Sequence, residues 1–344
     1  MRYLVTGGGG FIGSHLVDAL VARGDSVVVL DDLSTGSLAN LHGVRDSEQL
    51  EFVEGSILDE QLVQNAMESV DACVHLASAV GVQLVVSRPL DSLLRNVRGN
   101  DIVISAAARH RRPLLFTSTS EVYGKNSEGA LSEEADRVLG PPQLLRWSYA
   151  TAKAFGEALA CSYAREEGAH MSVVRLFNTV GPRQTGAYGM VLPRFVRQAL
   201  AGDDLTVYGD GRQSRCFGHV YDVVRGMLAV LDHPQATGRV FNIGSSVEMS
   251  ILGLAQKVIE RAGSSSKVTF VPYDEAYGDG FEELGRRRPD TAALEAFTDW
   301  RPTLTVDQAI DDVISYERAT AGIRPGARVD RELGSRREGV QLAR

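Results

Sequence analysis

The chain has few cysteines, and this excludes one group of small folds. Only Cys73, Cys161 and Cys216 occur in 344 residues, far apart and without the CxxC spacing of a zinc ribbon or a redox motif. Such a set argues against a disulfide framework and is typical of a protein of the reducing cytoplasm. The seven histidines are scattered too, and no cluster of His, Asp or Glu has metal-ligand spacing, so no metal is expected.

Long apolar runs and an excess of positive charge are absent as well. No run of about 18 apolar residues occurs, and the N-terminal segment is too short in apolar side chains for a signal peptide, so we expect no membrane partner. The 36 Lys and Arg residues are outnumbered by 44 Asp and Glu, a net charge of −8 that disfavours nonspecific nucleic-acid binding. The remaining composition, 44% hydrophobic and 23% charged, is that of a globular chain long enough for two lobes.

The first half of the chain alternates short apolar runs with amphipathic segments. Strands are predicted at residues 3–6, 26–30, 50–53, 72–76, 113–118 and 171–177, and helices at 11–23, 59–67, 90–109 and 148–167. Nearly continuous apolar strands between helices predict a parallel sheet that is covered on both faces. The predicted fold class is therefore α/β, a Rossmann-type doubly wound parallel sheet.

The pattern changes after residue 178, where proline and glycine become frequent and short strands and helices follow, at 205–208, 240–243, 251–262 and 267–271. We predict a first domain at 1–178 and a smaller C-terminal α/β lobe at 179–318, which binds the substrate and shares the core of the first. Residues 319–344 contain six arginines and little periodicity, which predicts a mobile basic tail.

The first predicted strand runs into a glycine-rich turn, composed of Gly7, Gly8, Gly9, Gly10, Phe11, Ile12 and Gly13. A side chain at Gly7 or Gly10 would block a pyrophosphate from the backbone N–H groups, and the helix that follows adds donors and a partial positive charge. Gly13 lets that helix pack closely on the strand. Asp31 follows 18 residues after Gly13, at the end of the second strand, where it can accept hydrogen bonds from a ribose diol and repel a 2′-phosphate. The sequence therefore predicts an NAD site.

A reactive group of side chains follows the fifth predicted strand. Thr119 stands at the strand end, and Tyr149 and Lys153 lie four residues apart, on one face of a helix. A phenol with a pKa of about 10 is a poor base at neutral pH, but a neighbouring ammonium and a positive nicotinamide favour the phenolate. The phenolate can then remove a proton from a sugar hydroxyl, with Thr119 in the same hydrogen-bond network.

These motifs carry a family resemblance. Over about residues 1–318 the chain resembles an extended short-chain dehydrogenase/reductase of the nucleotide-sugar epimerase/dehydratase type. The resemblance implies that Thr119, Tyr149 and Lys153 are catalytic. It also implies an NAD site formed by the glycine turn together with Asp31, Ser56, Ile57, the backbone around Ala77 and Ser78, Tyr149 and Lys153. Ser56 departs from the family, which often has an Asp there against the adenine.

The same resemblance places the substrate and a partner. It implies that Asn178 and Arg215 contact the diphosphate of a nucleotide sugar and that Tyr208 packs on its base. The helices predicted at 90–109 and 148–167 resemble those that form a homodimer interface, although their apolar faces could equally serve only the core of the chain itself.

Residues beside Thr119 distinguish the reactions of the family. A 4,6-dehydratase typically has Asp-Glu after the threonine, and a 4-epimerase usually has no carboxylate there, whereas Ser120-Glu121 is similar to the uronate decarboxylases. Arg146-Trp147, just before the catalytic tyrosine, is similar to them as well. So is the segment 277–281, which leads into a basic stretch where Arg287 matches an arginine near the substrate. The resemblance thus implies NAD-dependent decarboxylation of UDP-glucuronate to UDP-xylose.

Three points stay open at the level of sequence. Glu121 could raise the energy of the bound uronate, relay a proton to C5, or only bind neighbouring backbone. A 4-epimerase acting on UDP-glucose or UDP-glucuronate is the first alternative function. A non-catalytic NAD-binding scaffold is the second, and the intact set of Thr119, Tyr149 and Lys153 argues against it.

Overall fold

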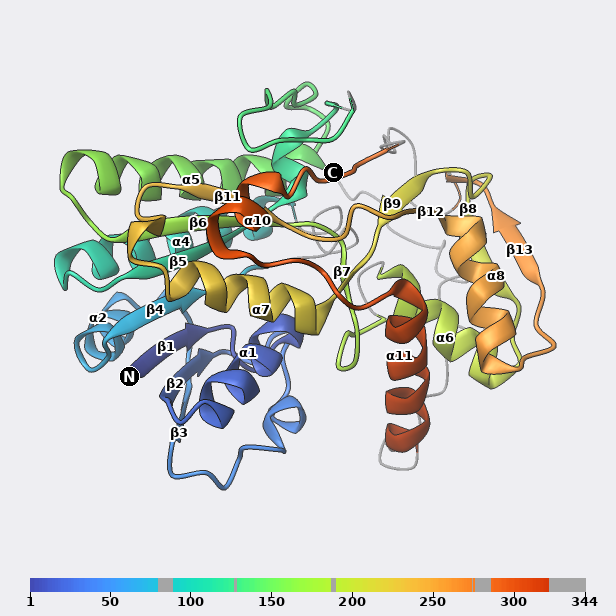
Figure 1. The fold of residues 1–344 in the computed structure, drawn as a ribbon, viewed down its shortest axis with the longest axis horizontal. Coiled ribbons are helices and arrows are strands. Elements are labelled where there is room, and N and C mark those ends of the chain that lie inside the picture. Colours follow the sequence, from blue (N-terminus) through green and yellow to red (C-terminus); the bar gives the residue numbers. More distant parts are fainter. Residues whose placement is uncertain (80–88, 127–128, 187–189, 274, 276–285, 322–344) are drawn as a thin grey trace, which may run out of the picture.

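The computed structural model describes residues 1–79, 89–126, 129–186, 190–273, 275 and 286–321. The predicted motif at 277–281 and the predicted tail beyond residue 321 lie outside these residues. Within them, the molecule has a large lobe built on a sheet and a smaller lobe beside it (Figure 1).

The large lobe contains the predicted doubly wound parallel sheet. Its seven strands have the order β11-β6-β5-β4-β1-β2-β3, and every neighbouring pair is parallel. The strands are β1 (Arg2–Thr6), β2 (Ser26–Asp31), β3 (Leu50–Glu54), β4 (Ala72–His75), β5 (Leu114–Thr119), β6 (Met171–Leu176) and β11 (Val240–Ile243). The order changes direction between β1 and β4, and such a switch point opens a crevice at the carboxyl ends of the strands.

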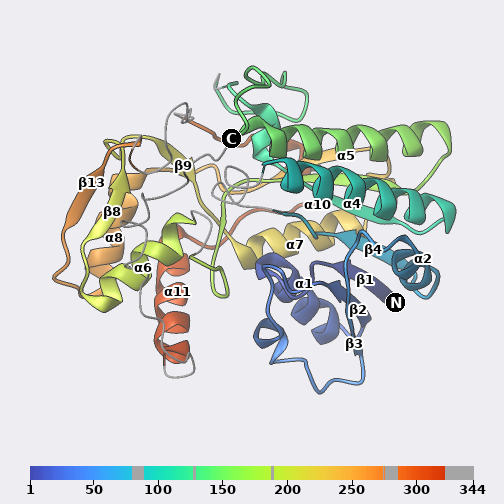
Figure 2. The same ribbon diagram turned by 180° about the vertical axis from the view of Figure 1, so that it is seen from behind.

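Helices cover both faces of the sheet (Figures 1 and 2). One layer is α1 (Phe11–Ala22), α7 (Val220–Leu231) and α10 (Ala292–Thr298); the other is α2 (Glu60–Glu68), α4 (Pro89–Arg109) and α5 (Trp147–Glu166). Side chains alternate between the two layers along each strand. Tyr3 and Val5 join the apolar cluster under α1 and α7, while Leu4 between them joins the cluster under α4 and α5.

The smaller lobe has its own apolar cluster, which includes Phe195, Leu254 and Ile310. Its helices are α6 (Val191–Ala201), α8 (Ile251–Ala262) and α11 (Val306–Thr320). Its strands form three short pairs: β7 (Thr179–Val180) with β10 (Gly218–His219), β8 (Leu205–Tyr208) with β13 (Val268–Val271), and β9 (Ser214–Cys216) with β12 (Glu248–Ser250).

The structure differs from the sequence prediction at two points. The sequence analysis does not predict α6, which lies in the stretch where proline and glycine are frequent. Pro193 lies in the first turn of the helix, where its missing N–H costs no hydrogen bond. The chain also returns to the large lobe beyond residue 178, since β11 pairs with β6 and α7 packs on the sheet. The predicted division at residue 178 therefore leaves one strand, β11, and two covering helices, α7 and α10, of the large lobe on its far side.

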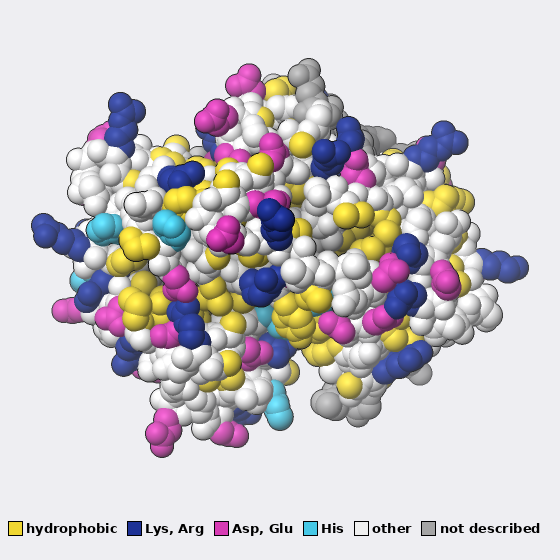
Figure 3. All heavy atoms as spheres, in the orientation of Figure 1, with side chains coloured by type: hydrophobic (Ala, Val, Ile, Leu, Met, Phe, Trp, Pro, Cys, Tyr) yellow, Lys and Arg dark blue, Asp and Glu magenta, His cyan; other side chains and the backbone are white. Residues whose placement is uncertain are grey.

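The surface mixes charges of both signs. In Figure 3 basic and acidic side chains are interspersed over the visible face, without a large area of one sign. Among the described residues, no helix combines the length and the apolar character needed to cross a bilayer.

Candidate active site

A cavity of about 540 Å³ runs along the carboxyl ends of the sheet strands and extends to the smaller lobe. Apart from Gly8 and Gly9 of the glycine turn, the residues predicted to bind cofactor or substrate, or to act in catalysis, line this one cavity: Gly7, Gly10, Phe11, Ile12, Gly13, Asp31, Ser56, Ile57, Ala77, Thr119, Ser120, Glu121, Tyr149, Lys153, Asn178, Tyr208, Arg215 and Arg287. The fold thus brings together residues that are up to 280 positions apart in the chain. Their individual roles remain predictions.

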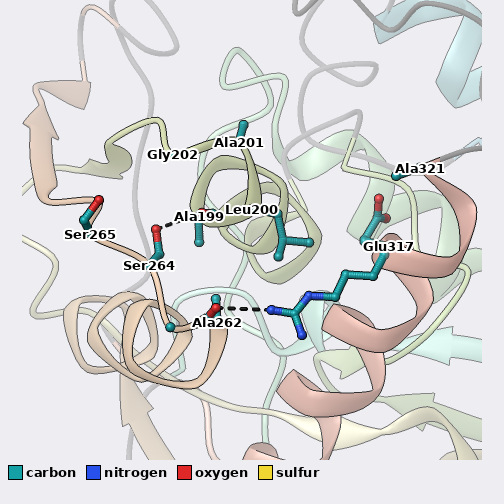
Figure 4. Close-up of a pocket in the computed structure, with 11 residues that line it drawn as sticks. Ala199, Leu200, Ala201, Gly202, Ala262, Ser264, Ser265, Glu317 and Ala321 are labelled. Carbon is teal, nitrogen blue, oxygen red and sulfur yellow. Dashed lines mark hydrogen bonds between the residues drawn. The ribbon is translucent and has the colours of Figure 1, made fainter.

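A second hollow lies where α6, α8 and α11 end (Figure 4). Its walls are mostly small residues, such as Ala199 and Ser264, and the guanidinium of Arg318 donates to the carbonyl of Ala262 at 3.2 Å. Its lining includes no residue of the predicted site, so we place the chemistry in the first cavity.

The glycine turn forms one end of the first cavity. A Cβ atom at Gly7 would lie 2.7 Å from the backbone nitrogen of Ala77, and one at Gly13 would lie 2.1 Å from the carbonyl oxygen of Gly7. Gly7 also has φ +74°, which favours glycine. Helix α1 starts directly after Gly10 with no side-chain cap, so its first N–H groups stay available to an anion. The turn therefore fits the pyrophosphate of a dinucleotide.

Asp31 has a second task that the sequence does not reveal. Its Oδ2 accepts a hydrogen bond from the backbone nitrogen of Gly9 at 2.9 Å, and its Oδ1 accepts one from that of Leu33 at 2.8 Å. Burial raises the pKa of this carboxyl despite these two bonds. Asp31 thus braces the glycine turn, and it also lines the cavity where a ribose diol is expected.

Tyr149 and Lys153 project from α5 toward the end of β5. The Lys153 ammonium is buried and donates to the carbonyl oxygen of Thr117 at 2.9 Å. Burial lowers the pKa of Lys153 to about 7, although nearby Glu157 opposes this. Burial also raises the pKa of Tyr149, against a hydrogen bond with Ser78. The phenol therefore needs additional positive charge to ionise, and a bound nicotinamide would supply it.

Glu121 lies between two arginines from distant parts of the chain. Its carboxylate is 2.5 Å from Nη1 of Arg287 and 3.2 Å from Nη2 of Arg146. Although burial raises the pKa of Glu121, the two guanidinium groups outweigh it and hold the pKa at about 2. The side chain is 24% exposed. Arg146 in turn lies 5.0 Å from the ring of buried Trp147. The cavity wall next to Tyr149 therefore carries a fixed anion with two cations.

The far end of the cavity belongs to the smaller lobe. Tyr208 ends β8, and the guanidinium of Arg194 lies 4.1 Å from the centre of its ring. Asn178 follows β6, and Arg215 lies in β9. This end thus combines an aromatic platform with cationic groups, as the base and diphosphate of a nucleotide require.

Several lining residues give no signal in the sequence. Arg194 and Gln213 belong to the smaller lobe, and Gln184 belongs to the loop before α6. Asn96 on α4 accepts hydrogen bonds from the Ser78 hydroxyl at 3.0 Å and from the Ala79 nitrogen at 2.8 Å, and so fixes the strand-end segment beside the cavity. None of these residues belongs to a spaced motif, so only the fold reveals them. Within the described residues, no group of three or more His, Cys, Asp or Glu is placed to hold a metal.

The glycine turn, Asp31 and the Tyr-Lys pair at the strand ends define a dinucleotide-dependent enzyme of the short-chain dehydrogenase type. The chain matches the model of the NAD dependent epimerase/dehydratase family over residues 3–244 and belongs to that family, with NAD as its cofactor.

The chain is similar to decarboxylases and to a 4-epimerase of this family. The chain is 38% identical over 318 residues to UDP-N-acetyl-alpha-D-glucosaminuronate decarboxylase of Bacillus cytotoxicus, covering 92% of this chain and 98% of that protein. It is 33% identical over 320 residues to UDP-glucuronic acid decarboxylase 1 of Xenopus tropicalis, with 92% and 72% covered. Its fold is similar to UDP-glucuronic acid 4-epimerase of Bacillus cereus in complex with UDP-glucuronic acid and NAD, with a TM-score of 0.83, 26% identity, and 93% and 99% covered.

Proposed function

We propose that this chain is an NAD-dependent decarboxylase of a UDP-linked hexuronic acid, and that it converts UDP-glucuronate to UDP-xylose. The observation that carries the proposal is the ionised Glu121 between Arg287 and Arg146, beside Tyr149. Forked guanidinium groups recognise carboxylates, and a uronic acid carries one on C5. The names of the two decarboxylase relatives support decarboxylation of a UDP-linked uronate, and the second of them supports UDP-glucuronate as the substrate.

The mechanism begins with oxidation at C4. Lys153 stabilises the phenolate of Tyr149, which takes the proton of the C4 hydroxyl while Thr119 holds the same oxygen. The glycine turn and Asp31 would hold NAD⁺, which would supply the acceptor for the hydride that leaves C4. The product is a 4-keto uronate, which is a β-keto acid. Its C5–C6 bond breaks without a metal, CO₂ leaves, and the electron pair moves into an enolate across C4 and C5.

Three steps then remain. The site holds the enolate while C5 is protonated, and it returns the proton to the C4 oxygen as the hydride returns to C4. Tyr149 and Thr119 face that oxygen in this proposal. A carboxyl with a pKa of about 2 carries no proton near neutral pH, which favours Glu121 as a fixed anion over Glu121 as a proton donor. Its negative charge next to the substrate carboxylate would raise the energy of the bound uronate and favour loss of CO₂.

The test is incubation of the purified protein with UDP-glucuronate, with and without added NAD⁺, with products identified by mass spectrometry and proton NMR. Loss of the mass of CO₂ establishes decarboxylation, and the NMR spectrum distinguishes UDP-xylose from a released UDP-4-keto-pentose. UDP-N-acetylglucosaminuronate is run in parallel, because the 38% identical relative is named for that substrate.

A 4-epimerase is the second candidate, favoured by the structural similarity to the Bacillus cereus enzyme. An unchanged mass with a new galacturonate anomeric signal would establish it and remove the decarboxylase proposal. Bound NAD⁺ without turnover of any nucleotide sugar would leave a non-catalytic scaffold.

We also propose that the chain forms a homodimer through α4 and α5. These helices lie side by side on one face of the sheet (Figure 2). The outward residues of α5 carry no charge along three turns: Thr151, Phe155, Ala158 and Ser162. Phe155 is 39% exposed, and Leu94 on α4 is 40% exposed. A second copy would bury these apolar side chains. Location in the cytoplasm stays a prediction from the composition.

A further inference from the structure

A buried ion pair lies directly behind the reactive side chains. Glu157 follows Lys153 by four residues on α5, so that Tyr149, Lys153 and Glu157 lie on one face of the helix. Both oxygens of its carboxylate accept hydrogen bonds from the guanidinium of Arg175 on β6, one from Nε at 2.9 Å and one from Nη2 at 2.8 Å. Glu157 is 3% exposed and Arg175 6%.

The pair is connected to the turn that carries Glu121. Nη1 of Arg175 donates to the hydroxyl of Tyr123 at 2.9 Å. Tyr123 is the last residue of the 3₁₀ turn Ser120–Tyr123, which begins next to Thr119. Its hydroxyl donates to Oδ1 of Asn242 at 2.8 Å, and Nδ2 of Asn242 donates to the carbonyl of Asp290, three residues beyond Arg287. One network thus joins the catalytic helix, the Glu121 turn and the Arg287 segment.

Stability alone does not account for a charge at this position. Removing two charges from water carries a desolvation cost, and a buried ion pair is often replaced by apolar side chains without loss of stability. Apolar side chains at these positions would lack the negative charge that Glu157 places one helical turn from the Lys153 ammonium.

Lys153 has little else to keep its proton. On its own helix it faces Tyr149 and Glu157, on β5 the carbonyl of Thr117, and on β4 the imidazole of His75. Burial lowers the pKa of His75 to about 3, so the ring is neutral. Among these described groups, Glu157 carries the negative charge.

We propose that Glu157, fixed by Arg175, is a positioning residue that keeps Lys153 protonated and so keeps the Tyr149–Lys153 pair competent. The proposal rests on the roles of Tyr149 and Lys153 in the proposed function, but the charge on Lys153 is measurable without substrate.

The chain is suited to a direct measurement, because it contains only four lysines, at positions 125, 153, 257 and 267. Protein loaded with NAD⁺ and labelled with ¹³C at the lysine ε-carbon gives four signals, and the Lys153→Arg variant assigns one of them. We expect the Lys153 signal of Glu157→Gln to titrate about one pH unit below that of the wild type, since an opposite charge within about 4–6 Å favours the charged form. The matched control is Glu166→Gln, which removes an exposed carboxylate from the same helix and should leave the midpoint in place.

An unchanged Lys153 midpoint in folded Glu157→Gln overturns the proposal. If Glu157→Gln does not fold, the double variant Glu157→Gln/Arg175→Gln removes both members of the buried pair. It leaves only the half-exposed Arg137, which lies 3.5 Å from the Glu157 carboxylate, without this partner, and its Lys153 midpoint decides in the same way. A kinetic measurement adds the functional consequence: the high-pH limb of NAD⁺ reduction by the nucleotide sugar should move down with the NMR midpoint. Failure of the chain to decarboxylate any uronate would leave the NMR result intact, so the two proposals fail separately.

Discussion

Gly13 occupies the tightest point of the glycine turn. A Cβ atom there would lie 2.1 Å from the carbonyl oxygen of Gly7, which is backbone and cannot rotate away. We expect Gly13→Ala to open the turn and to weaken NAD⁺ binding by about tenfold or more, a loss of about 1.4 kcal/mol. Calorimetric titration with NAD⁺ measures it. Gly43→Ala is the control, because a Cβ at Gly43 meets nothing within 4 Å. Wild-type affinity in folded Gly13→Ala would contradict the assignment of the turn.

Glu121 allows chemistry and stability to be tested with one substitution. We expect Glu121→Gln to reduce NAD⁺ with the uronate but to slow CO₂ release by about 10²-fold, since an electrostatic contribution of this kind is worth about 2.7 kcal/mol or more. Single-turnover measurement of NADH and CO₂ on the same sample separates the two steps. Unchanged CO₂ release would remove Glu121 from the mechanism.

The pH dependence of stability gives an independent check on the same residue. The arginines hold the pKa of Glu121 at about 2, below its ordinary value of 4.5, so its ion pairs stabilise the fold fully above pH 4.5 and lose effect as the pH falls toward 2. Urea denaturation of wild type and Glu121→Gln should therefore show the larger difference in free energy of unfolding near neutral pH. A difference that grows as the pH falls would be the wrong sign.

At the level of the element, α5 is positioned by contact with β5 rather than by its helix propensity. A Cβ at Gly156 would lie 2.4 Å from the ring of Phe116, which is fully buried in the sheet. Gly to Ala in a helix normally gains about 1 kcal/mol. We expect Gly156→Ala to destabilise the protein nevertheless and to lower kcat, because α5 must move away from the carbonyl that Lys153 contacts.

Thermal unfolding and steady-state kinetics measure this effect. The double variant Gly156→Ala/Phe116→Leu, which makes room for the new methyl group, should recover part of both the melting temperature and kcat. A higher melting temperature for Gly156→Ala alone would show that propensity outweighs the contact.

At the level of the whole molecule, the proposed dimer makes a definite prediction. Phe155 is the largest apolar side chain on the outward face of α5. We expect Phe155→Glu to place like charges opposite each other in a twofold interface and to convert the dimer to a monomer, measured by light scattering after size exclusion. Glu166→Gln, at the far end of the same helix, should stay dimeric. A monomeric wild type at micromolar concentration would contradict the proposal.

The sequence alone determined the elements and the motifs. The strand at 205–208, the strand at 240–243 and the helix at 251–262 lie where hydrophobic periodicity predicts them. The parallel sheet follows from the alternation of strands and helices in the first half of the chain. The glycine turn of the NAD site and the Tyr-Lys pair can also be recognised in the sequence. Sterics of a turn and the 3.6-residue period act between near neighbours in the chain, so a short stretch of residues contains the whole signal.

Only the tertiary structure decided how distant charges are paired. Glu121 pairs with Arg287, which lies 166 positions further along the chain, and Glu157 on α5 pairs with Arg175 on β6. It also decided that β11 returns to the sheet from beyond residue 178. An ion pair depends on where the sheet places each backbone, and that placement results from the packing of the two apolar clusters on its faces, which no local pattern records.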